Sequence, residues 1–158
     1  MAAAPLPPVS ATPPDMERIE DLGEPDDYEK LAAYLEERLY EFNVEATGHA
    51  EARYLGLAMR DSNDDVVAGA AGHTWHHTCF LGYVWVAESC RGKGLGSRLM
   101  RAVEHEARAR GCRNIVLSTH SFQSPEFYER MGFQRAAEVR DHPVGHANIW
   151  FTKVLGDG

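Results

Sequence analysis

The stretch RGKGLGSRL, which begins at Arg91, combines three glycines with basic side chains directly after the apolar run CFLGYVWV. A helix predicted to begin near Gly94 leaves its first backbone N–H groups without acceptors, and its dipole places positive charge there. Gly92, Gly94 and Gly96 allow phosphate oxygens to approach the backbone, and Arg91 and Lys93 add charge-assisted hydrogen bonds. This junction is therefore a predicted binding site for a pyrophosphate.

The spacing of these glycines disfavours two common nucleotide motifs. A Walker sequence, GxxxxGK[ST], needs lysine after its second glycine, whereas Lys93 lies between two glycines. A dinucleotide fold needs GxGxxG and an acidic residue at the end of the next strand. The glycines here follow GxGxG, and the next predicted strand, NIVLSTH, ends without a carboxylate. Neither ATP or GTP hydrolysis nor dinucleotide binding is expected.

The sequence HTWHH at residues 73–77 invites a metal-binding interpretation. His73 and His77 share one face of a predicted strand with Trp75. Zinc needs three or four ligands in suitable geometry, and neither a cysteine pair nor a carboxylate completes this set. We therefore expect a hairpin end that is rich in histidine and no metal site.

The elements that must position the glycine-rich stretch follow from periodicity and turn signals. Helical spacing of apolar residues predicts helices at PDDYEKLAAYLEERLYEFN and at GSRLMRAVEHEARARG, with Gly111 as the C-terminal cap of the second. A short helix is predicted at SPEFYERMG. Alternation and turn residues predict strands at RYLGLAMR, VVAGAAGHTW, CFLGYVWV and NIVLSTH, and a closing hairpin of FQRAAEVR and HANIWFTKVL.

This order of elements predicts an α/β (α+β) fold with a mixed, mostly antiparallel central sheet and helices on both faces. The helix after CFLGYVWV is a crossover connection, which lets this strand lie parallel to NIVLSTH. A chain of 158 residues suits a single domain, expected over residues 16–158. Residues 1–15 hold five of the eight prolines and are predicted to be a disordered tail.

Charge and composition limit the partners and the compartment. Residues 1–90 contain 17 acidic and 5 basic residues, whereas residues 91–158 contain 7 acidic and 11 basic residues. The net charge of −8 argues against nucleic-acid binding, and the basic second half suits an anionic ligand. No run reaches the roughly 18 to 20 apolar residues of a membrane span. Three cysteines without CxxC spacing suit a reducing, cytoplasmic location.

Two motifs together resemble the GCN5-related N-acetyltransferase family. The pattern R-x-x-G-x-G is present as Arg91, Gly94 and Gly96 between a strand and a helix, and FYERMGF is similar to the family's FY-x-x-x-GF element. The resemblance runs from about Met16 to Leu155. It implies the family's fold, in which the two parallel strands splay apart, and acetyl-coenzyme A (acetyl-CoA) as co-substrate with no metal. It is also compatible with a homodimer.

The resemblance implies that backbone amides of the glycine-rich stretch hold the pyrophosphate, while backbone groups at Trp85 and Val86 pair with the pantetheine arm. Ser121 stands where the family commonly has an asparagine that contacts the coenzyme, and Gln123 lies nearby. Either Ser121 or Gln123 is expected to take the place of this asparagine. The implied coenzyme contacts are Trp85, Val86, Arg91, Gly92, Lys93, Gly94, Leu95, Gly96, Ser97, Ser121, Gln123, Phe127 and Tyr128.

Acetyl transfer from a thioester needs an acid that protonates the leaving thiolate. Tyr128 is the candidate, because a phenol with a pKa of about 10 is protonated at neutral pH and can donate to the thiolate of a thiol whose pKa is near 8.5. The alternative is that Tyr128 only packs beside Phe127. The oxyanion would accept a hydrogen bond from a backbone N–H near Val86.

The attacking amine must also lose a proton, and no single base stands out. His120, at the carboxyl end of its strand, is one candidate; Glu41, Asp141 and His146 are others, and proton loss to water avoids a dedicated base. Glu41 and Asn43 are expected on the acceptor side. The predicted function is acetylation of a primary amine of a small molecule by direct attack. The alternatives are acetylation of a protein or peptide, and a non-catalytic acyl-CoA-binding sensor module.

Overall fold

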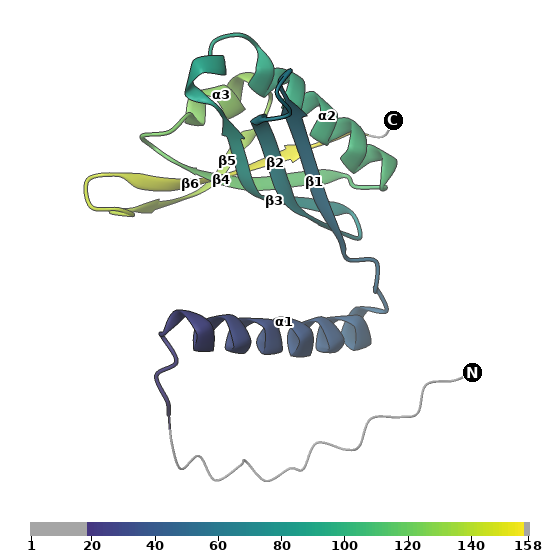
Figure 1. Ribbon diagram of the computed structural model, residues 1–158. Coiled ribbons are helices and arrows are strands. Elements are labelled where there is room, and N and C mark those ends of the chain that lie inside the picture. Colours follow the sequence, from purple (N-terminus) through teal and green to yellow (C-terminus); the bar gives the residue numbers. More distant parts are fainter. Residues whose placement is uncertain (1–18, 157–158) are drawn as a thin grey trace. The chain divides into compact units, whose positions relative to one another are not determined.

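The computed structural model describes residues 19–156 (Figure 1). The chain divides after Ala46 into a first unit that holds most of helix α1 (Pro25–Thr47) and a second unit that holds the whole sheet. Because the chain forms two compact units, the single domain expected over residues 16–158 stays a prediction. The predicted tail at residues 1–15 lies outside the described residues.

Helix α1 begins at Pro25, as its sequence predicts. Proline suits the first turn of a helix because its missing N–H would have no acceptor there, and Asp26 and Asp27 lie at the positive end of the helix dipole. The helix continues through Thr47, beyond the predicted end at Asn43, and stops before Gly48, whose φ is +73°. No described helix is long and apolar enough to cross a membrane.

The second unit is built on one six-stranded sheet with the strand order β1-β2-β3-β4-β6-β5. Only β3 and β4 are parallel among the described strand pairs. The predicted mixed, mostly antiparallel sheet is therefore confirmed. The strands are β1 (Arg53–Arg60), β2 (Val66–Trp75), β3 (Thr78–Val86), β4 (Asn114–His120), β5 (Gln134–Arg140) and β6 (Ala147–Val154).

The two parallel strands pair over their first halves only. Thr78–Leu81 of β3 pairs with Asn114–Leu117 of β4, and no pairing follows. At this point the register between β2 and β3 shifts by one residue at Gly82, which is the signature of a β-bulge. Because a bulge bends its strand, the remainder of β3 leaves β4, and the predicted splay is confirmed.

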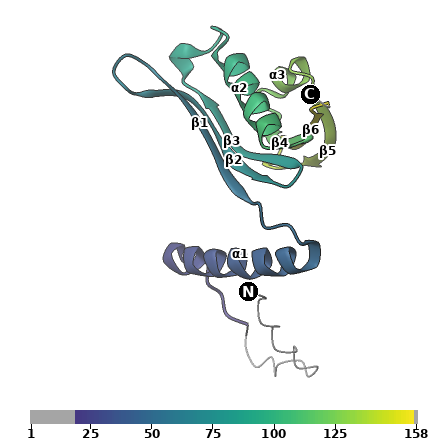
Figure 2. The same ribbon diagram turned by 90° about the vertical axis from the view of Figure 1, so that its right-hand side faces the viewer.

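Helix α2 (Leu95–Ala109) lies against β1, β2 and β3 (Figure 2). Leu99, Val103 and Ala107 of its predicted apolar face are buried in the core, whereas the fourth predicted position, Leu95, is half-buried. Gly111 has a φ of +79° just after the helix, as predicted for its cap. The sequence also predicts that the first helix, α1, covers one face of the sheet. Because α1 belongs to the other unit, this part of the fold stays a prediction.

Helix α3 (Pro125–Arg130) follows β4 and is fastened at its end. The Nζ of Lys153 on β6 donates to the Met131 carbonyl at 2.6 Å and to a Glu104 carboxylate oxygen on α2 at 2.6 Å. Glu104 is buried, so this ion pair is shielded from water and loss of either partner would leave a buried charge. The contacts hold the short helix in a fixed place beside α2.

Candidate active site

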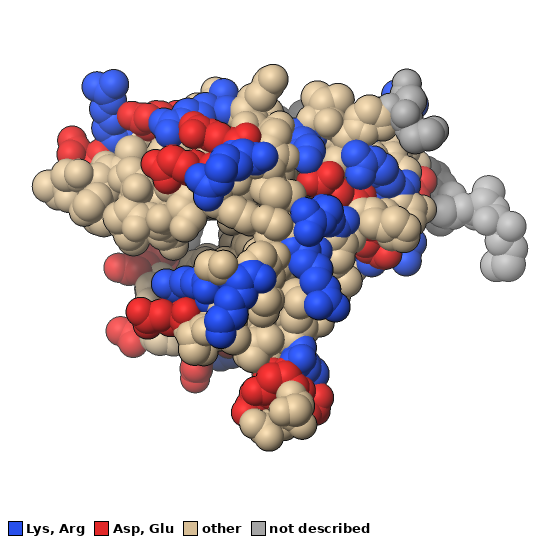
Figure 3. Space-filling model, turned by 90° about the horizontal axis from the view of Figure 1, so that it is seen from above, with Lys and Arg blue, Asp and Glu red and all other residues tan. Residues whose placement is uncertain are grey.

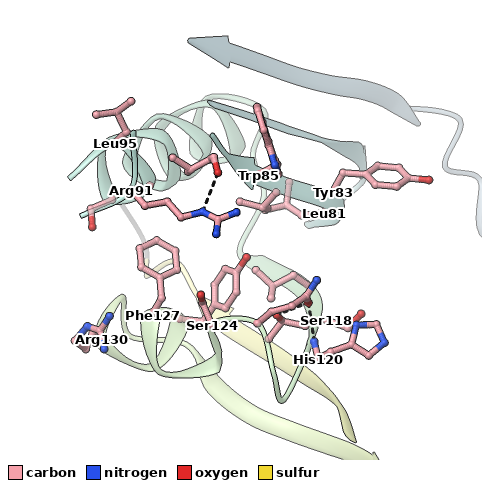
Figure 4. Close-up of a pocket in the computed structure, with 18 of the residues that line it drawn as sticks. Leu81, Tyr83, Trp85, Arg91, Leu95, Ser118, His120, Ser124, Phe127 and Arg130 are labelled. Carbon is pink, nitrogen blue, oxygen red and sulfur yellow. Dashed lines mark hydrogen bonds between the residues drawn. The ribbon is translucent and has the colours of Figure 1, made fainter. Parts of the chain in front are cut away.

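A cavity of about 830 Å³ opens where β3 and β4 part (Figure 4). Its walls come from residues 81–86 of β3, residues 117–120 of β4, the connection into α2, and α3. This volume is typical of sites for cofactor-sized ligands. The bulge at Gly82 and the end of strand pairing at Leu81 thus create the site.

The connection into α2 exposes a row of backbone donors. The first hydrogen bond of the helix runs from the Arg98 N–H to the Gly94 carbonyl, at 3.0 Å. Within residues 19–156, the N–H groups of residues 92–97 have no protein acceptor. Gly92 and Gly94 have φ values of +71° and +80°, a backbone conformation that favours glycine. These donors at the positive helix end suit a diphosphate, as predicted.

Gly96 lines the cavity and also lies against a side chain of α3. A Cβ atom at Gly96 would lie 3.3 Å from Cζ of Phe127, which is closer than ordinary van der Waals contact. Figure 4 shows Phe127 on the α3 side of the pocket, opposite Leu95 and Arg91. A side chain at position 96 would therefore press on the Phe127 ring where α2 and α3 approach each other, and the predicted coenzyme contact of Gly96 stays a prediction.

Several basic side chains belong to the start of α2 and to α3, and Figure 3 shows groups of Lys and Arg side chains on the face seen from above. Among the described residues, Arg91, Lys93, Arg98 and Arg130 have no carboxylate partner in an ion pair. Arg91 donates from Nε to the Val86 carbonyl at 3.1 Å and lines the cavity, as does Arg130, whereas Lys93 does not. Unpaired positive charge at this place attracts an anionic ligand.

The free edge of β3 presents alternate backbone groups to the cavity. The Ala87 N–H donates to the Val67 carbonyl of β2 at 2.8 Å. Because backbone groups of successive residues point to opposite edges of a strand, those of Val84 and Val86 face the parted side and those of Trp85 face β2. Val86 therefore suits its predicted backbone role, whereas Trp85 can line the cavity only through its half-exposed side chain.

Tyr128 lies in α3 with its ring in the core and lines the cavity. The ring contacts Phe127 edge-on at 5.1 Å and also packs on Phe133 and Phe151, with ring centroids 5.8 Å apart in both cases. No hydrogen bond to its hydroxyl is found within the described part of the chain. Burial raises the pKa of Tyr128 to about 12, so the phenol is protonated at neutral pH.

Ser121 and Gln123, the two alternatives for the missing asparagine, have different surroundings. The Ser121 hydroxyl oxygen accepts the Ala147 N–H at 3.1 Å, and this residue does not line the cavity. Gln123 lines the cavity, and its carbonyl oxygen accepts the His120 N–H at 2.8 Å and the Thr119 hydroxyl at 2.9 Å. Its amide NH₂ has no described protein partner, so Gln123 is the better placed of the two.

The candidate bases for the attacking amine lie in three different parts of the structure. His120 lines the cavity at the end opposite Arg91 in Figure 4, and its ring stacks on Phe122 with centroids 5.2 Å apart. His146 contacts the same Phe122 ring edge-on at 4.9 Å. The Asp141 carboxylate instead accepts the Gly145 N–H at 3.2 Å and shapes the turn between β5 and β6. Glu41, like Asn43, belongs to the unit of α1, so its predicted position stays a prediction.

Several cavity residues were not found from the sequence. Most of them come from β3 and β4 at and beyond the last paired residues, and the others lie in the connections after these strands or at the end of α3. Alternation along two strands predicted to splay would have found part of the set, but the residue at which pairing stops is not visible in the sequence. These residues are Leu81, Gly82, Tyr83, Val84, Cys90, Leu117, Ser118, Thr119, Phe122, Ser124 and Arg130.

A sheet with one parted parallel pair, beside a helix start with free N–H groups, offers an extended cavity with anion-binding donors at one end. The family model described as "Acetyltransferase (GNAT) family" matches residues 16–133. The chain belongs to this family and is an acetyl-CoA-dependent N-acetyltransferase.

Relatives of known name and structure agree with this class. An acetyltransferase of Agrobacterium fabrum is 29% identical over 115 residues, which are 73% of this chain and 84% of the relative. Blasticidin-S acetyltransferase of Streptomyces morookaense is 38% identical over 92 residues, 58% of this chain and 68% of that protein. The crystal structure of a Bacillus cereus acetyltransferase has a TM-score of 0.74 and 30% identity, covering 88% of this chain and 98% of its own.

Proposed function

We propose that this enzyme transfers the acetyl group of acetyl-CoA directly to a primary amine of a small molecule, with Tyr128 as the general acid. The observation that carries the proposal is the setting of Tyr128. Its ring is fixed among three aromatic rings, whereas its hydroxyl has no described protein partner and the residue lines the cavity. A purely structural buried tyrosine usually finds a hydrogen-bond partner.

The residues of the cavity fit a coenzyme A thioester, which supplies the acetyl group when bound. The N–H groups of residues 92–97 would hold its diphosphate, and Arg91 would add positive charge. Val84 and Val86 would bond to the amides of the extended arm, as an added strand does. Gln123 would donate from its amide NH₂ on the other side of the cavity.

Tyr128 would deliver its proton to the sulfur as the thiolate leaves. Burial keeps the phenol protonated but also makes it a weaker acid, because its pKa of about 12 lies further above that of a thiol, about 8.5 in water. The same apolar surroundings would destabilise a thiolate formed beside the ring and so raise the pKa of the coenzyme thiol. The gap between the pKa of Tyr128 and the pKa of the thiol would then be smaller than in water. Proton transfer is therefore accessible from Tyr128.

His120 is the base that we propose for the amine, because it lines the cavity at the end of β4. The stacked rings of Phe122 and His142, with centroids 5.2 and 5.6 Å from that of His120, restrict its orientation. A neutral imidazole there could accept the proton of the ammonium group directly or through one water molecule. The oxyanion would meet a backbone N–H of the free β3 edge near Val86.

The glycine-rich turn gives a direct test of the coenzyme site. We expect Gly94→Ala to weaken acetyl-CoA binding about tenfold, because alanine disfavours the left-handed backbone by roughly 1–2 kcal/mol and relaxation would reorient the N–H groups. Gly111→Ala is the matched control, since Gly111 has nearly the same φ, +79°, at the other end of α2. Calorimetry with acetyl-CoA should distinguish the two variants, whereas both should lower the unfolding temperature. Equal affinities would exclude this turn from the coenzyme site.

The acceptor is tested with a panel of amines. Similarity to blasticidin-S acetyltransferase supports a small-molecule acceptor, so we expect kcat/KM for the best small amine, with blasticidin S included, to exceed that for peptides at least about tenfold. Release of free thiol from acetyl-CoA reports turnover. A preference for peptides would favour the protein-acetylating alternative. Tight acetyl-CoA binding without thiol release for any amine would favour the sensor module.

A further inference from the structure

The histidine-rich turn between β2 and β3 lies beside the segment that leads into β1. His76 and His77 form the turn that links these two strands. Arg53, the first residue of β1, pairs with Thr74 near the end of β2. Because β1 and β2 are antiparallel, residues 49–51, which precede β1, come next to the turn. The HTWHH motif thus receives neighbours that are distant from it in the sequence.

Three of these side chains gather their metal-binding atoms. One ligand atom each from His49, Glu51 and His76 lies within 4.8 Å of the other two. His49 Nδ1 is 3.6 Å from a Glu51 carboxylate oxygen, and the rings of His49 and His76 stack with centroids 3.7 Å apart. The carboxylate whose absence argued against a metal site in the sequence is therefore supplied by Glu51, and His49 adds a further histidine.

The surroundings hold these groups together. The indole Nε1 of Trp75 donates to the His49 carbonyl at 3.1 Å, which fastens the segment to the end of β2. The His77 ring lies 3.8 Å from that of His76, and its Nδ1 is 3.0 Å from the Gly111 carbonyl. A carbonyl can only accept, so Nδ1 of His77 donates to it, and the neutral form of this ring has its lone pair on Nε2. An imidazole bound in this way to a carbonyl is typical of metal-ligating histidines.

We propose that His49, Glu51 and His76 form a binding site for a divalent transition metal ion, zinc in particular. Two imidazoles and a carboxylate are a ligand set that zinc accepts, with His77 or water in the fourth position. The side chains are exposed or half-buried, so small rotations can shorten the 4.8 Å spread. The site shares no residue with the cavity proposed for acetyl-CoA, and it does not depend on the proposed function.

Two arginines lie near the proposed metal site, and one of them is paired with a carboxylate. Arg53 and Arg110 line a smaller cavity of about 360 Å³ together with Glu51, His76 and His77. Arg110 is paired with Glu106 at 2.7 Å, so it is not available to neutralise Glu51. Bound metal would tie the segment before β1 to the turn between β2 and β3.

Zinc titration of the full chain after treatment with a chelator tests the proposal. We expect saturable binding of one Zn²⁺ per chain by calorimetry and a rise in the unfolding temperature. Glu51→Gln and His76→Asn should each weaken binding at least about tenfold, because each removes one ligand. Asparagine is chosen at His76 because that residue has a φ of +48°, which asparagine tolerates.

His73→Gln is the matched control. His73 lies three residues away, and its ring contacts Phe80 rather than the cluster, so zinc affinity should be unchanged. Co²⁺ in place of Zn²⁺ should give the intense visible absorption of a four-coordinate site, and this absorption should be lost in Glu51→Gln. Acetyl-CoA affinity, measured in parallel, should be unaltered in all variants and confirms that they are folded. Absence of saturable binding, or equal zinc affinity in wild type and both ligand variants, would overturn the proposal.

Discussion

Tyr128→Phe is expected to lower kcat at least about tenfold while leaving the Kd for acetyl-CoA within about twofold of wild type. The substitution removes only the hydroxyl and keeps the ring that packs on Phe127, Phe133 and Phe151. Loss of the proton donor affects departure of the thiolate rather than binding, so the effect should fall on turnover. Thiol release under saturating substrates gives kcat, and calorimetry gives Kd.

Tyr54→Phe is the matched control for this prediction. Tyr54 lies on β1, is 84% exposed and is not among the cavity residues, so the same chemical change there should leave kcat unaltered. If Tyr128→Phe keeps full turnover, Tyr128 is not the acid. If both kcat and acetyl-CoA affinity fall together, the residue acts through packing rather than proton transfer.

The pH dependence of turnover adds a second test of Tyr128. Because burial raises its pKa to about 12, the phenol stays protonated as the pH rises through 10, where an exposed tyrosine ionises. Turnover should therefore show no alkaline decline from this residue below about pH 11. An alkaline decline centred near pH 9 that disappears in Tyr128→Phe would contradict the raised pKa of Tyr128, although not its role as the acid.

Among the substitutions proposed, Gly72→Ala is expected to lower the free energy of unfolding most. A Cβ atom at Gly72 would overlap the Phe80 carbonyl oxygen and lie 2.9 Å from the Leu81 Cα, and both are backbone atoms. Since backbone cannot rotate away, β2 and β3 would have to separate beside the bulge. We expect a loss of at least about 3 kcal/mol in the free energy of unfolding, and an unfolding temperature lower by about 10 °C or more.

The control for this variant is Gly56→Ala on β1. A Cβ atom at Gly56 would meet nothing within 4 Å, so this substitution should change the unfolding temperature little or raise it slightly. Thermal and urea unfolding of both variants, followed by circular dichroism, make the comparison. A Gly72→Ala protein as stable as Gly56→Ala would show that the β2–β3 pair is not locked at the bulge.

Local sequence determines much of this fold. The starts of α1 and α3 at proline, the glycine after α2 and the alternation of the strands depend on backbone preferences and on burial of neighbouring side chains, which act over a few residues. The glycine-rich turn with its free N–H groups belongs to the same group, because it needs only three glycines and the beginning of a helix. Such features are predictable since their cause lies within one segment.

The tertiary structure decided what depends on contacts between distant segments. The end of β3–β4 pairing at Leu81 creates the cavity, yet nothing in that strand's own periodicity marks the position. A Cβ atom at Gly96 would meet the ring of Phe127, and Gln123 is better placed than Ser121 because β6 engages the serine. Each outcome depends on which atoms meet across the sheet.

At the histidine-rich turn, too, the local sequence determined one part of the arrangement and contacts between distant segments decided the other. The sequence established that histidines gather at one hairpin end, and it contained no nearby carboxylate. Strand register brings His49 and Glu51 near His76, because antiparallel pairing of β1 with β2 places the segment before one strand beside the end of the other, and the Trp75 indole fastens that segment. Composition and spacing thus determined the class of this enzyme, and packing between distant segments decided the geometry of its sites.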